Sequence, residues 1–407
     1  MRRAIIVIFF ISWGVRLFAQ PVLKPFPQHA KYFAGAIKPN NVSQRQLDDA
    51  VRSFYTQWKI RYVKNVPGKA ESYVWFDEKE DKKQCVSEGQ GYGMVITVLM
   101  AGYDPLAKQT YDNLFHYYRA HPSRRDKHLM AWAQKTDGTD EDSTSAADGD
   151  MDIAYSLLLA DKQWGSKGNI NYLQAARVMI GDIMLFDVNH KTWSVLLCDG
   201  IEADSNDFFD TRSSDFMPDH LKAFAKVTGD PNWLKVLDEG YQLFGGLQNK
   251  YSPTAGLIPD FIVHINKTPK PAPAHYLESP YDGSYNYNAC RDPWRIATDF
   301  LLTGDKRSKT MVDKINRWIR ETTNNNTYNL SAGYTLEGDD IKDRDYEALS
   351  FSAPFTVSAM VDQANQAWLN NLWVYVTAFK LKDFDYYDNT IKLMDMIIIS
   401  GNYWDIR

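Results

Sequence analysis

The spacing of apolar residues along the chain predicts a protein built mainly of α-helices. Ser43 and Gln46 form the pattern of a capping box, in which each side chain hydrogen-bonds the backbone of the other residue. Similar periodic segments up to residue 400 predict about a dozen helices. Strand-like alternation is scarce, and residues 257–265 are the best candidate for a strand. The first helix shows the pattern most clearly, with apolar residues on one face at Leu47, Val51, Phe54, Tyr55, Trp58 and Tyr62.

Glycines and Asp-Pro pairs mark where these helices end and begin. Gly102, Gly229 and Gly304 each follow an apolar helical segment, at the place just beyond a helix where glycine is favoured. Asp104-Pro105 and Asp230-Pro231 each combine an acid suited to the N-cap with a proline suited to the first helical position. The next helix therefore starts almost directly after the previous one ends.

Short links of this kind predict pairs of antiparallel helices, and Thr-Gly-Asp at residues 228–230 recurs at 303–305 as the sign of an internal repeat. The 407 residues exceed the size of most single cores, yet no linker rich in Gly, Ser or Pro interrupts residues 40–407. We therefore expect one large domain, residues 20–407, arranged as a closed ring of helical hairpins with a cleft at one end.

Composition and charge exclude several classes of protein. The formal charge of −5 is too mild to suggest binding to nucleic acid, and we expect no nucleic-acid partner. With 44% apolar and 24% charged residues, the chain is neither disordered nor a membrane bundle. Aromatic residues reach 14%, which suits flat apolar ligands that stack on rings, such as sugars.

The first 19 residues have the pattern of an export signal. Arg2 and Arg3 precede the apolar residues 4–14, and Ala19 offers a small residue before a cut at Gln20. The apolar run is shorter than the about 20 residues that cross a bilayer, so we expect no membrane span after its removal. The mature chain would then carry 43 basic and 51 acidic residues, a charge of −8, and be exported to the periplasm or beyond.

Three cysteines, Cys85, Cys198 and Cys290, lack the spacing of a zinc site or of a disulfide framework. One disulfide bond with one free thiol remains open as an alternative. We expect no metal and no cofactor, and a monomer in solution.

Two polar segments carry candidate chemistry in the first half of the chain. Residues 85–94 hold three glycines within five positions, so something must approach their backbone closely, and Glu88 there is either a helix-start carboxylate or a functional acid. Residues 146–152 carry three alternating acids, but Ile153 and Leu159 stand where a calcium loop needs Gly and Glu. Asp148 is thus either a helix cap or a buried carboxylate that recognises sugar hydroxyls.

Two further polar segments lie at residues 211–219 and 275–295. The first contains Arg212 and Asp215, and the second contains Glu278, Asn288 and Arg291. Arg291 and Arg295 lie one turn apart, and they either orient carboxylates or form ordinary surface ion pairs, which are the commoner case. No single segment decides the function.

Together, over residues 31–404, these segments resemble glycoside hydrolase family 8, whose members cut β-1,4-linked glucans, xylans and chitosan with inversion. Ser87-Glu88-Gly89 followed by Gly91-Tyr92-Gly93-Met94 resembles the proton-donor segment, and residues 148–164 resemble the family signature, with Ala147 where Ser or Thr is usual. The resemblance implies an all-α (α/α)6 barrel of about twelve helices with minor β elements. It also implies that residues 20–407 are one catalytic domain, that Glu88 is the general acid and that Asp148 binds the sugar at the cleavage site.

The resemblance also concerns the residues that hold a β-linked polysaccharide. Trp132 is similar to the family's stacking platform. We expect further substrate-binding residues at Tyr92, Arg212, Asp215, Asn288 and Arg291.

One position departs from the commoner family pattern. Many members place the catalytic base as Asp where this sequence has Asn288, and an amide cannot take a proton. A subgroup that includes bacterial β-glucanases and chitosanases resembles this chain by carrying Asn there and a Glu on an inserted loop upstream. We therefore expect Glu278 to be the base. An inverting glycosidase needs two carboxyl groups about 6.5–9.5 Å apart, which must come from different elements.

The leading hypothesis is an exported endo-acting β-1,4-glycanase, with β-glucan favoured over chitosan and then xylan. A catalytically weak carbohydrate-binding protein is one alternative, although both Glu88 and Glu278 are present. Another helical-barrel enzyme, a prenyl-diphosphate cyclase or a polysaccharide lyase, is a second alternative. The cyclase would need an Asp-rich magnesium motif inside a helix, whereas Asp148 and its neighbouring acids lie at a helix start.

Overall fold

The computed structural model describes residues 21–77, 82–342 and 346–406, and the predicted export signal lies outside these ranges. Twelve α-helices occur in the described residues, as the periodicity predicts. They are α1 Gln44–Tyr62, α2 Ser87–Leu99, α3 Ala107–Ala120, α4 Ala147–Trp164, α5 Tyr172–Phe186, α6 Pro218–Thr228, α7 Asn232–Tyr251, α8 Asp292–Thr303, α9 Lys306–Thr322, α10 Leu349–Ala359, α11 Gln366–Ala378 and α12 Tyr386–Ile399.

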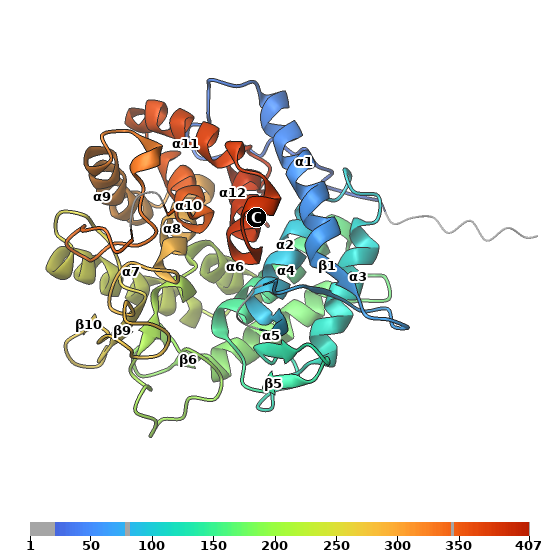
Figure 1. The fold of residues 1–407 in the computed structure, drawn as a ribbon. Helices are drawn as coiled ribbons and strands as arrows, with labels where there is room; N and C mark the ends of the chain where they lie inside the picture. Colours follow the sequence, from blue (N-terminus) through green and yellow to red (C-terminus); the bar gives the residue numbers. More distant parts are fainter. Residues whose placement is uncertain (1–20, 78–81, 343–345, 407) are drawn as a thin grey trace, which may run out of the picture.

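The helices form two concentric rings (Figure 1). The even-numbered helices make the inner ring: each contacts the next, and α12 closes the circle by contacting α2. The odd-numbered helices lie outside: α3, α5, α7, α9 and α11 each pack against the inner helix that directly precedes them in the chain, and α1 packs against α12. The predicted (α/α)6 barrel is therefore confirmed.

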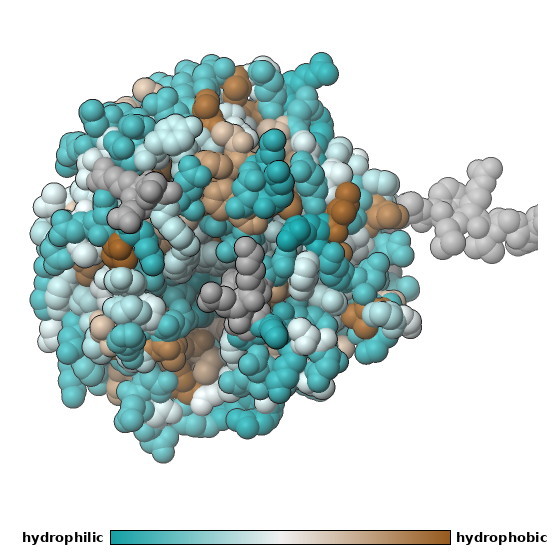
Figure 2. All heavy atoms as spheres, viewed as in Figure 1, coloured by the Kyte–Doolittle hydropathy of each residue, from teal (hydrophilic) through white to brown (hydrophobic). Residues whose placement is uncertain are grey.

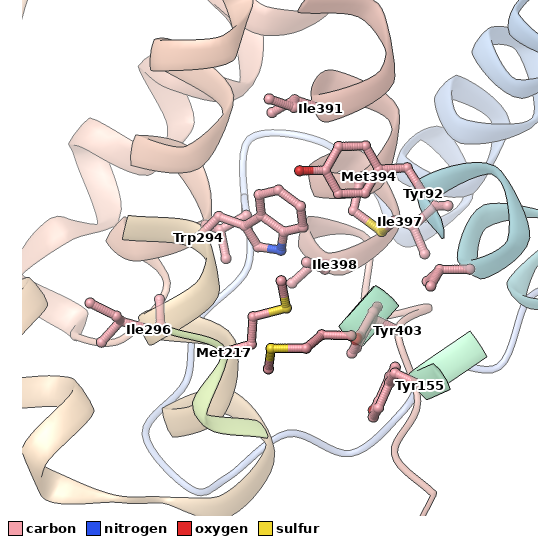
Figure 3. Packing of buried hydrophobic residues seen from close by; sticks show 14 of the residues in the cluster. Tyr92, Tyr155, Met217, Trp294, Ile296, Ile391, Met394, Ile397, Ile398 and Tyr403 are labelled. Atoms are coloured by element: carbon pink, nitrogen blue, oxygen red, sulfur yellow. The ribbon is translucent and has the colours of Figure 1, made fainter. Parts of the chain in front are cut away.

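Burial explains which helices lie inside. Every residue of α10 is buried, and Glu88 is the one residue of α2 that is not, so these helices are enclosed on all sides. Outer helices bury a single stripe instead, as in α9 at Met311, Val312, Ile315 and Ile319. Side chains of the inner helices fill the axis of the barrel, where Trp294, Met217 and Met394 pack together (Figure 3).

Several of the predicted helix ends are confirmed. The capping box of Ser43 is present, and Gly229 and Gly304 end α6 and α8 in the left-handed conformation with φ of 74° and 75°. Asp230 is a correction, because α7 begins only at Asn232 and Pro231 is its N-cap. Asp104 is a second correction, because α3 begins only at Ala107. Its carboxylate accepts the backbone N–H of Leu106 and the hydroxyl of Tyr55 instead, so it fixes the turn before the helix and ties it to α1.

Short strands occupy the loops that lead into the inner helices. One antiparallel sheet joins β3 Lys83–Val86, β4 Ala133–Lys135 and β5 Asp140–Asp142, and β3 runs directly into α2. A second joins β8 Thr211–Arg212, β9 Phe261–Val263 and β10 Lys270–Pro271. The strand expected at residues 257–265 is thus present but shorter. Two-stranded pairs form from β1 Val63–Asn65 with β2 Ser72–Val74, and from β6 Val188–Asn189 with β7 Ser194–Val195.

The inner helices all run in the same direction, because each is separated from the next by one antiparallel outer helix. Their N-terminal ends consequently meet at one end of the barrel, together with the two three-stranded sheets. Figure 2 shows a hollow near the middle of the face in view, bordered largely by hydrophilic atoms. No helix within the described ranges has the length and hydropathy needed to cross a membrane.

Candidate active site

The N-terminal ends of four inner helices bring most of the predicted residues together. Glu88 lies in the first turn of α2 and Asp148 in the first turn of α4. The other segments come just before α6 and α8 as two 3₁₀ turns, η1 Ser213–Asp215 and η2 Ala289–Arg291. The N-terminus of a helix carries a partial positive charge, so the helix dipoles stabilise carboxylates at this end of the barrel. One hydrogen-bonded network links Glu88, Tyr92, Asp148, Arg212, Asp215, Asn288 and Arg291.

Gly91 of α2 and Gly149 of α4 allow this convergence. A Cβ at Gly91 would lie 2.8 Å from the Cβ of Asp152, and one at Gly149 would lie 2.7 Å from the carbonyl carbon of Ser87. Real side chains do not come that close, so only glycine lets α2 and α4 cross at this distance. The close approach that the sequence predicts is therefore made by a neighbouring helix.

Arg291 is the centre of the network and is almost fully buried. Its Nη1 donates to Glu88 Oε2 at 2.5 Å, to Asp148 Oδ2 at 2.9 Å and to the Tyr92 hydroxyl at 3.2 Å. Its Nη2 donates to Ser214 Oγ at 2.7 Å and to Asn288 Oδ1 at 2.9 Å. The alternative of an ordinary surface ion pair is wrong for this arginine, because it orients carboxylates inside the protein.

Glu88 is enclosed but reachable, with 18% of its side chain exposed. Burial raises the pKa of its carboxyl group to about 7, against the opposing effect of the Arg291 guanidinium, and the nearby Asp148 carboxylate adds to the rise. A carboxyl group with this pKa stays protonated at mildly acidic pH. Glu88 can therefore act as a proton donor.

Asp148 has the opposite character. Burial alone would raise the pKa of its carboxyl group, but the guanidinium groups of Arg212 and Arg291 hold it well below the usual range. Arg212 Nη2 donates to Asp148 Oδ1 at 3.2 Å, so each carboxylate oxygen faces one arginine. The capping alternative is wrong, because Ala146 is the N-cap of α4 and has no capping side chain.

Asp215 lies behind Arg212 and is fully buried. Its Oδ1 accepts from Arg212 Nε at 2.9 Å, and burial raises the pKa of its carboxyl group to about 6 although Arg212 opposes the rise. Asp215 therefore orients Arg212 rather than facing the cleft.

Asn288 connects Arg291 to Glu278 on its loop. Its Oδ1 accepts from Arg291, which can only donate, so its Nδ2 must point the other way, where it donates to Glu278 Oε2 at 2.7 Å. An aspartate at this position would place a second carboxylate against Glu278. The amide at 288 and the glutamate at 278 are thus a matched pair, with Glu278 exposed to solvent.

Two acids that the sequence analysis did not select hold this loop. Asp282 is buried and accepts the backbone N–H groups of Leu277, Glu278 and Ser279 at 2.6, 3.0 and 2.8 Å. Asp260 accepts the N–H groups of Asn286 and Ala289 at 2.9 and 2.7 Å, and burial raises its pKa to about 7. Asp260 could have been found from the sequence, because it is an acid inside the otherwise apolar run of residues 257–265.

Trp132 joins the site through its backbone, because its carbonyl accepts the N–H of Ser87 at 2.8 Å, one residue before Glu88. Its ring is only partly buried, and the ammonium group of Lys83 lies 5.1 Å from the ring centroid. The ring therefore borders the site without belonging to the core.

The cysteines form no disulfide bond, and a group of metal-ligand type lies apart from the site. Cys85, Cys198 and Cys290 are all free thiols, so the open alternative of one disulfide bond is wrong. Within the described ranges, Asp126 and His128 of the loop between α3 and β4 form a group of metal-ligand type with Asp182 of α5, and none of the three is among the site residues.

Known proteins are similar to this chain over nearly its whole length. Residues 25–401 match the family model described as Glycosyl hydrolases family 8. The chain is 48% identical over 383 residues to a beta-glucanase of Niallia circulans, covering 94% of this chain and 91% of that protein. It is 42% identical over 390 residues to an endoglucanase of Bacillus sp. (strain KSM-330), covering 94% and 82% respectively.

Solved structures agree as well. The fold superposes on the beta-1,3-1,4-glucanase from Paenibacillus sp. X4 with a TM-score of 0.90 and 47% identity, covering 94% of this chain and 99% of that chain. Rex8A from Paenibacillus barcinonensis shares the fold at 18% identity with a TM-score of 0.75. On these matches, the chain belongs to glycosyl hydrolase family 8 and is a glycoside hydrolase.

Proposed function

We propose that the protein is an endo-acting glucanase that cleaves β-1,4 bonds in β-glucan with inversion of the anomeric carbon. The observation that carries this proposal is the contrast between two carboxyl groups linked through Arg291 and Asn288. Glu88 has a pKa raised to about 7 and is enclosed, whereas Glu278 is exposed on its loop. One protonated and one ionised carboxyl group from separate elements are what inverting hydrolysis requires.

Glu88 acts as the general acid in this proposal. Its Oε2 accepts from Arg291, so Oε1 carries the proton and gives it to the glycosidic oxygen as the bond to the anomeric carbon breaks. Glu278 acts as the general base: Asn288 holds its Oε2, and Oε1 takes a proton from the water that attacks the opposite face of the sugar. In each cycle Glu88 loses one proton and Glu278 gains one. Proton exchange with solvent then returns both groups to their starting state.

Asp148 binds the sugar at the cleavage site rather than moving a proton. A carboxylate with a depressed pKa and an arginine at each oxygen is a poor base, but it is a fixed, ionised acceptor for sugar hydroxyls. Tyr92, Arg212, Asn288 and Arg291 keep this acceptor and Glu88 in place, with Asp215 behind Arg212.

Trp132 provides a stacking platform in this proposal. Replacing it by alanine should weaken binding of a soluble glucan oligosaccharide by about 1–3 kcal/mol, the range known for stacking on aromatic rings. Calorimetric titration of the folded variant measures this loss. A large fall in melting temperature with unchanged affinity would show that the ring serves the core instead.

The substrate follows from the relatives, which are named as β-glucanase and endoglucanases. We expect mixed-linkage β-glucan and carboxymethylcellulose to be hydrolysed faster than chitosan, and chitosan faster than xylan. The negative charge of the chain would attract cationic chitosan, but net charge governs encounter more than specificity. A reducing-sugar assay on the four polymers at equal mass concentration tests this order, and faster hydrolysis of chitosan than of both glucans would contradict it.

Export completes the proposal. A polymeric glucan does not enter a cell, so the enzyme must reach it outside, and residues 1–19 have the pattern of a signal that would direct it there. We propose that the mature enzyme acts as a monomer in the periplasm or beyond.

A further inference from the structure

A second layer of charged groups lies beneath the candidate site, inside the inner ring. The hydroxyl of Tyr92 accepts from Arg291 Nη1 at 3.2 Å and also from Arg295 Nη2 at 3.1 Å. Arg295 Nη2 donates in turn to Asp152 Oδ2 at 3.2 Å, and both residues are buried. The network around Glu88 therefore continues from α2 through α8 to α4.

His220 of α6 is the next member of this layer. Its Nε2 lies 3.1 Å from Asp152 Oδ1 and its Nδ1 lies 3.0 Å from Asp219 Oδ1. An imidazole that faces a carboxylate with each nitrogen must donate from both, so it carries a proton on each. Burial opposes this charge, but Asp219 and Asp152 outweigh it and raise the pKa of His220 to about 9.

Aromatic packing fixes the His220 ring. Tyr155 stacks on it with centroids 3.9 Å apart and planes inclined by 14°, and the hydroxyl of Tyr403 donates to Asp219 Oδ2 at 3.4 Å. Figure 3 shows Tyr155 and Tyr403 close together, with the Tyr92 ring beside Trp294. The stacked ring and the hydrogen bonds of both nitrogens hold the imidazole between its two carboxylates.

A cavity of about 10 Å³ adjoins these groups, close to the space that a single water molecule needs. The charged groups that line it come from three inner helices: Asp152 of α4, Asp219 and His220 of α6, and Arg295 of α8. From α12, the buried Asp395 interacts electrostatically with Arg295. Thr298, Tyr403 and apolar side chains complete the lining, and the site is buried, so these charges act on one another with little screening by solvent.

We propose that the imidazolium of His220 is a positioning residue for hydrolysis, which acts through Asp152 and Arg295 to hold Tyr92 and Arg291, and thereby Glu88, in their catalytic arrangement. This inference rests on the proposed role of Glu88 as the acid. It assigns a function to the third acid of the sequence Asp148-Gly149-Asp150-Met151-Asp152, which neither capping nor sugar binding explains.

The direction of the effect follows from charge. Without a cation at 220, Arg295 is drawn toward Asp152 and away from the Tyr92 hydroxyl, and the surroundings of Glu88 become more negative. A more negative environment raises the pKa of an acid. Removing the charge of Asp152 instead makes the surroundings more positive and lowers it.

The test compares pH profiles of kcat/KM on soluble β-glucan for the whole enzyme and three variants. We expect His220→Gln to lower kcat about tenfold with KM changed by less than about twofold, and to move the alkaline limb to higher pH. Asp152→Asn should move that limb to lower pH. Thr298→Val is the control, because Thr298 lines the same cavity while its hydroxyl donates to the Trp294 carbonyl at 2.8 Å, and its profile should match that of the wild type.

A loss of melting temperature without any movement of the alkaline limb in His220→Gln would overturn the proposal, because a merely structural histidine would behave in that way. If that variant does not fold, histidine NMR of the unmodified enzyme still decides. His220 should remain protonated up to pH 8, and titration below pH 7 would overturn the proposal. The NMR result does not depend on which residue is the acid, so it separates failure of this inference from failure of the proposed function.

Discussion

Replacing Glu88 by glutamine should lower turnover on polymeric β-glucan by about 10²–10⁴-fold while leaving affinity for an oligosaccharide nearly unchanged. The amide keeps the shape of the carboxyl group and its contact with Arg291, but it has no proton to give to a leaving oxygen of high pKa. The loss should shrink for an aryl glycoside whose leaving group is already acidic. Steady-state kinetics on both substrates measure the difference.

The pH dependence identifies the group responsible. Because the acid must be protonated, and burial raises the pKa of Glu88 to about 7, kcat/KM of the wild type should fall as the pH rises through about 7. Asp215 and Asp260 are matched controls, since burial raises their pKa to about 6 and about 7. Asp215→Asn and Asp260→Asn should keep the alkaline limb even if they lose activity. More than a few per cent of wild-type turnover in Glu88→Gln would show that another group is the acid.

Replacing Glu278 by alanine should abolish hydrolysis, with a loss of at least about 10²-fold, because the attacking water then has no group to take its proton. Asn288→Ala should cost less, since an amide can only hold Glu278 and the water in place. The order of the two effects, measured as kcat on the same glucan, is the test.

A folded Glu278→Ala enzyme that remained active, or a larger loss in Asn288→Ala, would move the base elsewhere. Asp148 and Asp215 would then be the next candidates. Neither is well placed, because both oxygens of Asp148 face arginines and Asp215 is fully buried.

Local chemistry made much of the fold predictable. The capping box at Ser43, the left-handed glycines at 229 and 304, and the apolar periodicity all act within a few residues, so the sequence carries them directly. Asp104 was wrongly predicted as a helix cap. Its carboxylate bonds Tyr55 of α1 instead, and a pattern of neighbouring residues does not contain that contact. The closure of the ring between α2 and α12 is likewise a contact between distant segments.

In the candidate site, too, the sequence predicts local motifs but not the contacts between distant segments. Motif resemblance indicated Glu88, Asp148 and Glu278. The pKa shifts of Glu88 and Asp148, however, depend on Arg212 of strand β8 and Arg291 of turn η2, which lie far from them in the sequence. Asp282 and His220 carried no motif at all. Their importance arises from partners such as the loop backbone and Asp152, which only the folded chain brings near.

The anomer of the first product tests the proposed mechanism most directly. If water attacks from the face opposite Glu88 with Glu278 as base, hydrolysis of a β-linked glucan should release the α anomer first. Proton NMR of the reaction in its first minutes, before mutarotation, distinguishes the anomers. Early appearance of the α signal is the predicted result, and early appearance of the β signal would mean a retaining mechanism with a nucleophile other than the water assigned to Glu278.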